Sequence, residues 1–291
     1  MRLLACLAGG LFACQADPPP PPSPPLPADS GHPVTRATAT PVLTATTAQA
    51  PRPPRDPACP DDMSLVAGRY CPAVSQPCVK RPKTRGGEAR KQCQHYGKSR
   101  CLSKTRRAMR FCMDRYEWPN EVGAMPRTLT SWPEARKMCA ARGKRLCTVD
   151  EFNFACEGES MKPHVYGHMR DKSACNFDRK YIARTHNYKR WERCMNNPVC
   201  RGEYERLDQR KPAGAMKRCV SEHGIYDLNG NVNEWVMRPK QASPRRSGLK
   251  GGWWGPVRNR CRPITTFHLE GDWGYEVGFR CCKSPAATLD R

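Results

Sequence analysis

Eighteen cysteines in 291 residues constrain this chain more than any other feature of its sequence. Their spacings are varied, with no paired CxxC motifs and no Cys/His arrangement typical of a zinc site. Such a cysteine content is unusual in the cytosol, where thiols are kept reduced. The sequence therefore predicts an exported protein whose domain is held together by disulfide bonds.

The first fourteen residues are similar to a bacterial export signal. Arg2 precedes a short apolar run that ends in Leu11-Phe12-Ala13-Cys14, which resembles a lipobox. The run is too short to cross a bilayer as a helix. We expect cleavage before Cys14, lipidation of that cysteine, and attachment to a membrane through the lipid anchor. The expected location is the bacterial cell envelope, as an outer-membrane lipoprotein or a periplasmic protein.

Residues 15–58 are rich in Pro, Ala and Thr and contain few apolar side chains. Such a segment cannot bury enough surface to fold, and its prolines favour extended polyproline II structure. We interpret it as a disordered stalk. The folded domain is expected at 59–284, followed by a short tail at 285–291.

The chain is strongly basic, with a formal net charge of +23. A basic surface favours anionic partners, although nucleic acid is not expected for a chain that leaves the cytoplasm. Residues 80–110 are the most basic segment and have little apolar content, which indicates an exposed insertion. A solvated basic face remains the alternative. The candidate anion-binding patch consists of Lys80, Arg81, Lys83, Arg85, Arg106 and Arg107.

Two capping boxes predict the helices of the domain. Ser131-Trp132-Pro133-Glu134 opens a helix that we expect to end at Gly143, and Thr148-Val149-Asp150-Glu151 opens a second helix that ends near Glu157. Alternating or apolar runs predict strands, and residues 160–218 show no periodicity, so long loops held by disulfides are expected there. Few helices and many loops indicate an α+β domain. The expected strands are 62–71, 111–117, 249–254 and 277–282.

The segment Gly224–Trp235 gathers oxygen-bearing side chains around the Asn229-Gly230 turn. Asp227 and Glu234 supply carboxylates, and a hard cation such as Ca²⁺ prefers six to eight oxygen ligands. A polar turn whose side chains bond their own backbone is the alternative. The spacing alone leaves both interpretations open.

Six motifs, taken in order, resemble the formylglycine-generating enzyme or sulfatase-modifying factor family, and the likeness runs from about 63 to 282. It implies an α+β variant of the C-type lectin fold, with little regular structure and bound calcium. The implied calcium ligands are Asp227, Gly230, Val232 and Glu234. The motifs are Ser131-Trp132-x-Glu134-Ala135, Gly143-Lys144-Arg145-Leu146-Cys147-Thr148, Tyr166-Gly167, the segment Gly224–Trp235, Lys250-Gly251-Gly252-x-Trp254 and Gly278-Phe279-Arg280.

The chain departs from that family where its enzymes carry out their chemistry. The resemblance implies oxidation of a sulfatase cysteine to formylglycine by O₂ and copper held by two cysteines, yet the segment Gly251–Cys261 has only one. Either Cys261 stands at the second catalytic position, or a shorter loop places it at a structural cysteine. We prefer the second alignment, which implies the disulfides Cys156–Cys261 and Cys139–Cys281. Under both alignments the thiolate pair that suits Cu(I) is incomplete.

These observations favour a non-catalytic binding or scaffold module at the cell envelope, with a cell-envelope protein or an anionic glycan as its partner. One alternative is a formylglycine-generating oxidoreductase acting on sulfatase cysteines, in which Cys261 and copper would be catalytic. The other is a lectin-like module that binds glycans or other anions through its basic face.

Overall fold

The computed structural model describes residues 57–83, 92–185 and 196–286, all within the compact unit Gln49–Arg291. The expected signal peptide, its Cys14, almost all of the stalk, Arg85 and most of the tail lie outside the described residues. No helix in the described ranges is long and apolar enough to cross a membrane.

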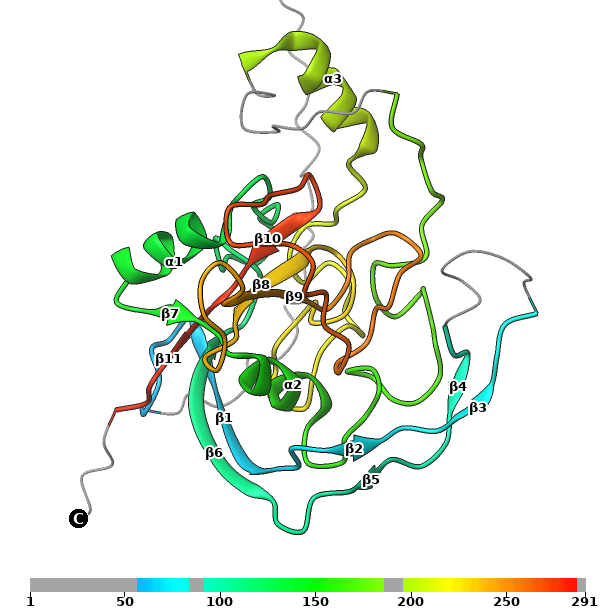
Figure 1. The fold of residues 1–291 in the computed structure, drawn as a ribbon, viewed down its shortest axis with the longest axis vertical. Helices are drawn as coiled ribbons and strands as arrows, with labels where there is room; N and C mark the ends of the chain where they lie inside the picture. The colour runs from blue at the N-terminus through cyan, green and yellow to red at the C-terminus, as the bar shows by residue number, and fades with distance from the viewer. Residues whose placement is uncertain (1–56, 84–91, 186–195, 287–291) are drawn as a thin grey trace, which may run out of the picture. The chain divides into compact units, whose positions relative to one another are not determined.

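A four-stranded sheet joins the two ends of the domain (Figure 1). Strand β1 (Met63–Tyr70) pairs antiparallel with β6 (Arg107–Asp114), which pairs in turn with β11 (Cys281–Lys283); β7 (Arg145–Leu146) forms the far edge. Strand β6 begins four residues before the predicted strand because it pairs with the whole of β1, up to Tyr70.

A three-stranded sheet has the order β10-β8-β9. Strand β8 (Asn233–Met237) runs parallel to β10 (Val277–Phe279) and antiparallel to β9 (Ser247–Lys250). The predicted strand 249–254 stops at Lys250, since Gly251 and Gly252 have φ values of +80° and +79° and turn the chain away.

The two predicted helices form and are capped as expected. Helix α1 (Trp132–Ala141) and helix α2 (Val149–Glu157) each begin with a capping box. In α2 the Thr148 hydroxyl accepts from the Glu151 backbone N–H, and the Glu151 carboxylate accepts from the Thr148 N–H at 2.8 Å. The buried face of α2 packs in the largest hydrophobic cluster.

Helix α3 (Pro198–Leu207) lies within the region that the sequence analysis assigned to loops, so that prediction is wrong at 198–207. Asn197 is its N-cap, and its side-chain oxygen accepts from the N–H groups of Val199 and Cys200. The buried positions of the helix are Cys200, Glu203, Tyr204 and Leu207, which is the spacing of one helical face.

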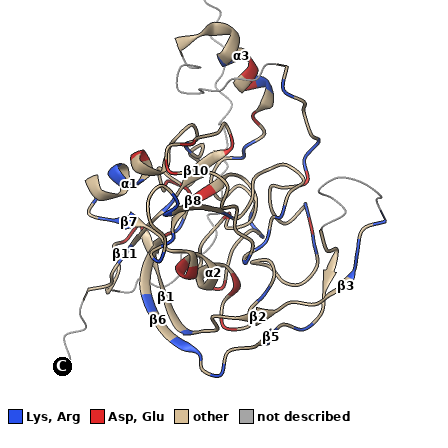
Figure 2. Cartoon of the chain, viewed as in Figure 1, with Lys and Arg blue, Asp and Glu red and all other residues tan. Residues whose placement is uncertain are grey.

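The described parts of the basic segment 80–110 contribute to two narrow ribbons, and the insertion is not exposed throughout, since Cys93 and Tyr96 are buried. Figure 2 shows its blue positions on β3 and at the end of β6 that adjoins the ribbons. Strand β2 (Val74–Ser75) pairs with β5 (Arg100–Cys101), and β3 (Cys78–Lys80) pairs with β4 (His95–Tyr96). The disulfides Cys71–Cys101 and Cys78–Cys93 tie the ribbons.

Every cysteine in the described residues is disulfide-bonded. This disulfide-rich α+β domain has little regular structure, as the sequence predicts, and so many bridges indicate an oxidising compartment. Cys200 also forms a disulfide, in addition to the seven pairs in which both cysteines are described. The pairs are Cys59–Cys112, Cys71–Cys101, Cys78–Cys93, Cys139–Cys281, Cys147–Cys282, Cys156–Cys261 and Cys175–Cys219.

Candidate functional site

The segment Gly224–Trp235 forms a buried turn in the middle of the domain. Gly230 has φ +83°, and a Cβ at this position would lie 2.4 Å from the Asn176 carbonyl oxygen, so only glycine fits. The Asn231 N–H donates to that carbonyl, and Asn229 Oδ1 accepts from the Val165 N–H at 2.8 Å. The turn therefore anchors neighbouring loops through the backbone N–H of Asn231 and the side-chain amide of Asn229.

Three buried carboxylates surround this turn, one of which the sequence analysis missed. Glu234 forms a bidentate pair with Arg280, at 2.6 and 2.8 Å. The missed residue is Glu117, which accepts from Asn231 Nδ2 at 2.6 Å and from the Val232 N–H at 3.1 Å. Burial raises the pKa of Glu117 well above its usual value, and it raises the pKa of Asp227 to about 6.

Two of the four predicted calcium ligands, Asp227 and Glu234, accept hydrogen bonds from protein donors in this arrangement. Both oxygens of Glu234 accept from Arg280, and Asp227 Oδ2 accepts from the Gly214 N–H at 2.8 Å. Across the described ranges, no group of three or more His, Cys, Asp and Glu side chains could hold a metal ion. In this arrangement Glu234 is the partner of the buried Arg280, and calcium binding at the predicted ligands stays a prediction.

The structure separates the residues of the predicted anion patch. Lys80, Arg81 and Lys83 are exposed at the β3 end of the ribbons. Arg106 instead donates to the backbone carbonyls of Arg69 and Glu159, and Arg107 pairs with Asp150 at 2.6 Å beside α2. The patch therefore divides into an exposed group on β3 and a group engaged with the protein near α2.

The segment Gly251–Cys261 ends in a buried disulfide. Cys261 is fully buried and bonds Cys156 of α2, while Cys139 bonds Cys281, and these are the two pairs that the resemblance implies. This position agrees with the shorter-loop alignment. Since the sulfur of Cys261 is in a disulfide, it offers no thiolate to a copper ion.

Buried polar side chains fix the loop that leads to Cys261. Lys250 Nζ lies 2.5–2.9 Å from the side-chain oxygen of Asn153 and the carbonyls of Cys261, Arg262 and Pro263. Arg170 Nη2 donates to the Val257 carbonyl at 3.0 Å. The loop therefore has a defined backbone path over much of its length.

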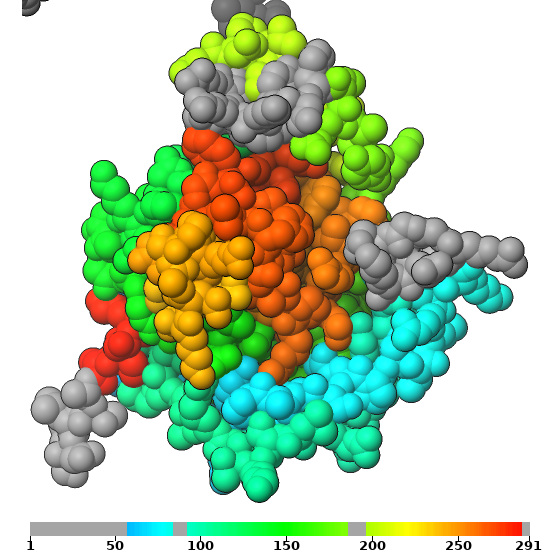
Figure 3. Space-filling view, viewed as in Figure 1, coloured from blue at the N-terminus to red at the C-terminus, as the bar shows by residue number. Residues whose placement is uncertain are grey.

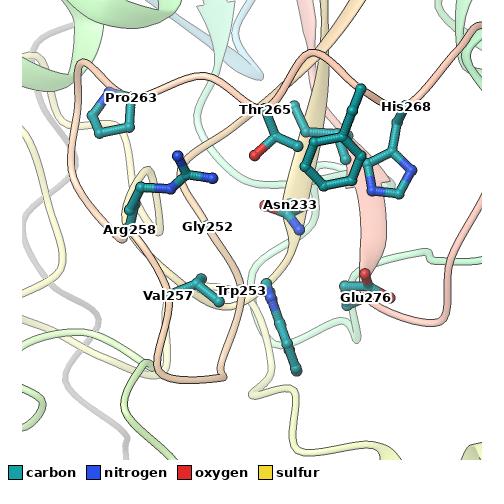
Figure 4. Close-up of a pocket in the computed structure, with 11 residues that line it drawn as sticks. Asn233, Gly252, Trp253, Val257, Arg258, Pro263, Thr265, His268 and Glu276 are labelled. Carbon is teal, nitrogen blue, oxygen red and sulfur yellow. The ribbon is translucent and has the colours of Figure 1, made fainter. Parts of the chain in front are cut away.

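This loop forms one wall of a pocket of about 290 Å³, lined on other sides by the segment 263–268 and the first ends of β8 and β10 (Figure 4). Figure 3 shows that the segment 250–270, in orange, occupies the middle of one molecular face. The lining contains no cysteine. Its polar groups are Asn233, Arg258, Thr265, His268 and Glu276, and its apolar groups include Trp253 and Phe267.

Arg258 and Glu276 lie at opposite sides of this pocket (Figure 4). No ion pair to another described residue engages the guanidinium of Arg258 or the carboxylate of Glu276, and the Glu276 carboxylate accepts only from its own backbone N–H. Burial raises the pKa of Glu276, against the opposing charge of Arg184. Burial also lowers the pKa of His268, so this neighbour tends to be neutral and supplies little positive charge. The pocket thus offers a guanidinium and a carboxyl group that form no ion pair with another described residue.

Comparison with known proteins relates this arrangement to one family. The inactive Cα-formylglycine-generating enzyme 2 of Bos taurus is 29% identical over 167 residues, which cover 52% of this chain and 48% of the relative. Its Mus musculus counterpart is 28% identical over 176 residues, covering 55% and 49%. The chain therefore spans about half the length of the curated relatives it matches.

Among solved structures, the crystal structure of CarF has a TM-score of 0.47 and 14% identity, covering 77% of this chain and 98% of CarF. The family model described as a sulfatase-modifying factor enzyme 1-like domain matches residues 80–285, well over half of the sequence. The chain belongs to the sulfatase-modifying factor enzyme 1-like domain family.

Proposed function

We propose that this chain is an exported binding or scaffold module in which the family's domain no longer generates formylglycine. The observation that carries the proposal is the Cys156–Cys261 disulfide, which leaves no thiol in the segment where the family's copper pair is expected. A bis-thiolate site needs two free cysteines, and every described cysteine is bonded. The two relatives described above are named as inactive formylglycine-generating enzymes, which supports the same proposal.

The test is to incubate the purified full chain with copper, O₂ and a sulfatase-type cysteine peptide. We expect no aldehyde by mass spectrometry of the peptide or by a hydrazide probe. The matched variants are Cys261→Ser and Cys78→Ser, each of which removes one disulfide. Cys78 lies on β3, outside the segment Gly251–Cys261. Aldehyde that wild type and Cys78→Ser form and Cys261→Ser does not would establish the oxidase alternative.

We further propose that the domain is displayed at the bacterial cell envelope. A lipid anchor at Cys14 and the Pro-rich stalk would hold it away from the membrane. A cell-envelope protein or an anionic glycan is the expected partner, because the net charge is +23.

The glycan alternative is supported by the exposed Lys80, Arg81 and Lys83 on the β3 ribbon. Binding to an acidic polysaccharide should weaken steeply with salt, because exposed charges are screened within about 8 Å at physiological ionic strength. Replacing these three residues with Gln should abolish it, whereas binding that survives both high salt and the triple variant would contradict this alternative.

Calcium at Asp227, Gly230, Val232 and Glu234 stays a proposal, and it requires Glu234 to exchange Arg280 for the cation. Its test is thermal unfolding with added Ca²⁺ and with a chelator. Calcium that binds only the folded state must raise the melting temperature. An unchanged melting temperature across saturating Ca²⁺ and excess chelator would contradict it.

A further inference from the structure

We infer that the pocket between Arg258 and Glu276 binds a small zwitterion, with an ammonium group at Glu276 and a carboxylate or phosphate group at Arg258. This inference rests on the proposed function, because it gives the module a ligand at the position where no thiol is available. The pocket volume of about 290 Å³ is at the lower end of the range for small-molecule sites, so the ligand must be a small molecule.

The Glu276 side of the pocket calls for a cation. A half-buried carboxylate without an ion-pair partner is unfavourable, and an entering ammonium would supply both charge and N–H donors. The indole of Trp253 lines the same pocket, and an aromatic face beside a carboxylate attracts ammonium groups. Gly274 leaves room for this carboxylate, because a Cβ on it would lie 2.7 Å from Glu276 Oε2 and the Glu276 side chain would have to shift.

The Arg258 side of the pocket calls for an anion. Its side chain is exposed, and it extends into the pocket without a bonding partner among the described residues (Figure 4). A guanidinium can donate two parallel hydrogen bonds to a carboxylate or a phosphate. The Thr265 hydroxyl is directed toward the same space in Figure 4 and can donate to the same group.

The region between the two charges suits a short linking segment. The Asn233 amide lies centrally in Figure 4, between Arg258 and Glu276. Phe267, which is 73% exposed, also lines the pocket, and its ring is tilted against that of His268 with ring centroids 4.5 Å apart. A simple anion would meet Glu276, and a simple cation would meet Arg258, so a molecule carrying both charges is the best complement.

The experiment uses ω-amino acids of increasing length, from glycine to 6-aminohexanoate, as probes of the full chain in calorimetric titrations. We expect one chain length to bind best, because only one matches the separation of the two charges. Hexanoate and hexylamine, which each lack one charge, should bind at least tenfold more weakly than the best zwitterion. Phosphocholine and phosphoethanolamine form a second arm, and their tighter binding would identify a lipid headgroup as the source of the zwitterion.

Two charge-neutralising variants give the assay its specificity. Glu276→Gln should lose the preference for 6-aminohexanoate over hexanoate, and Arg258→Gln should lose the preference over hexylamine. Arg260→Gln is the matched control, because Arg260 is not part of the pocket lining and contacts Gln76 at 3.2 Å instead. Binding should be retained in this control.

No binding of any zwitterion up to about 50 mM, a concentration that covers sites with millimolar affinity, would overturn the inference. Binding unchanged in both Arg258→Gln and Glu276→Gln would overturn it as well. Neither result depends on the aldehyde assay, so failure of the ligand inference and failure of the proposed loss of oxidase activity are distinguishable.

Discussion

His164 provides a quantitative prediction about pH and stability. Its side chain is fully buried, stacked on Tyr166 at 5.3 Å and close to Phe177 at 6.2 Å, and neither ring nitrogen makes a well-formed hydrogen bond to a described residue. Burial, reinforced by the positive charges of Arg170 and Arg260, lowers the pKa of His164 to about 3. The imidazole is therefore neutral throughout the ordinary pH range of the folded protein.

The sign of the effect follows from proton linkage. Below a pH of about 6.5 the histidine is protonated in the unfolded state, whereas in the folded state it stays neutral down to about pH 3. The free energy of unfolding therefore falls as the pH falls from about 6.5 to about 3. At about pH 5 the loss is about 2 kcal/mol, since roughly 1.5 pH units below 6.5 correspond to 1.36 kcal/mol each. At about pH 7 it is close to zero.

The variant His164→Phe isolates this contribution. The ring stack can persist, and no well-formed hydrogen bond is lost, so the variant should gain about 2 kcal/mol relative to wild type between about pH 7 and about pH 5. Buried carboxyl groups such as Asp227, whose pKa burial raises to about 6, act in the opposite direction but are present in both proteins and cancel. The measurement is urea unfolding at a series of pH values with the disulfides intact.

His95→Phe is the control, because it makes the same substitution at an exposed histidine and should not reproduce the pH-dependent gain of His164→Phe. If the stability difference between His164→Phe and wild type does not change with pH, the inference that the buried ring excludes the proton is wrong.

The remaining predictions concern covalent and ionic links. Replacing both Cys156 and Cys261 with Ala should lower the free energy of unfolding by up to about 5 kcal/mol, since the bridge closes a separation of 105 residues; an unchanged urea midpoint would contradict it. Arg280→Met should cost about 3–5 kcal/mol because it leaves Glu234 buried without its partner, and adding Glu234→Gln should restore part of that loss; an additive double variant would argue against the pair. In a bacterial host, an alkyne fatty acid should label the full chain but not Cys14→Ser, and equal labelling would refute the anchor.

Local signals in the sequence were sufficient to predict helices α1 and α2. Both capping boxes lie immediately before their helices, and the reciprocal bonds of Thr148 and Glu151 are made between residues only three positions apart. A contact of that kind depends on the local sequence alone, so it can be predicted without knowledge of the fold. Strand β1 could likewise be predicted from local sequence, because it contains the apolar run Leu65-Val66-Ala67 and ends next to a turn.

Helix α3 and Glu117 were missed for a different reason. The buried face of α3 includes Glu203, whose carboxylate accepts hydrogen bonds from Arg206 and Thr185. Because a charged residue occupies this face, the pattern of apolar residues along α3 does not repeat with the period of a helix. The Asn197-Pro198 pair was the available signal. Glu117 contacts Asn231 and Val232 more than a hundred positions away, and no local pattern encodes such a pairing.

The pocket and the disulfide beneath it illustrate how this scaffold can keep a binding site without thiol chemistry. The Gly252–Pro263 wall is held by backbone carbonyls that accept from Lys250 and Arg170, and neither donor depends on the redox state of Cys261. The Cys156–Cys261 disulfide leaves no free thiol at this position and tethers the end of the loop to α2. The physical requirements of a cavity and of a copper site are therefore separable here, because the cavity needs a fixed backbone path while the copper site needs two free thiolates.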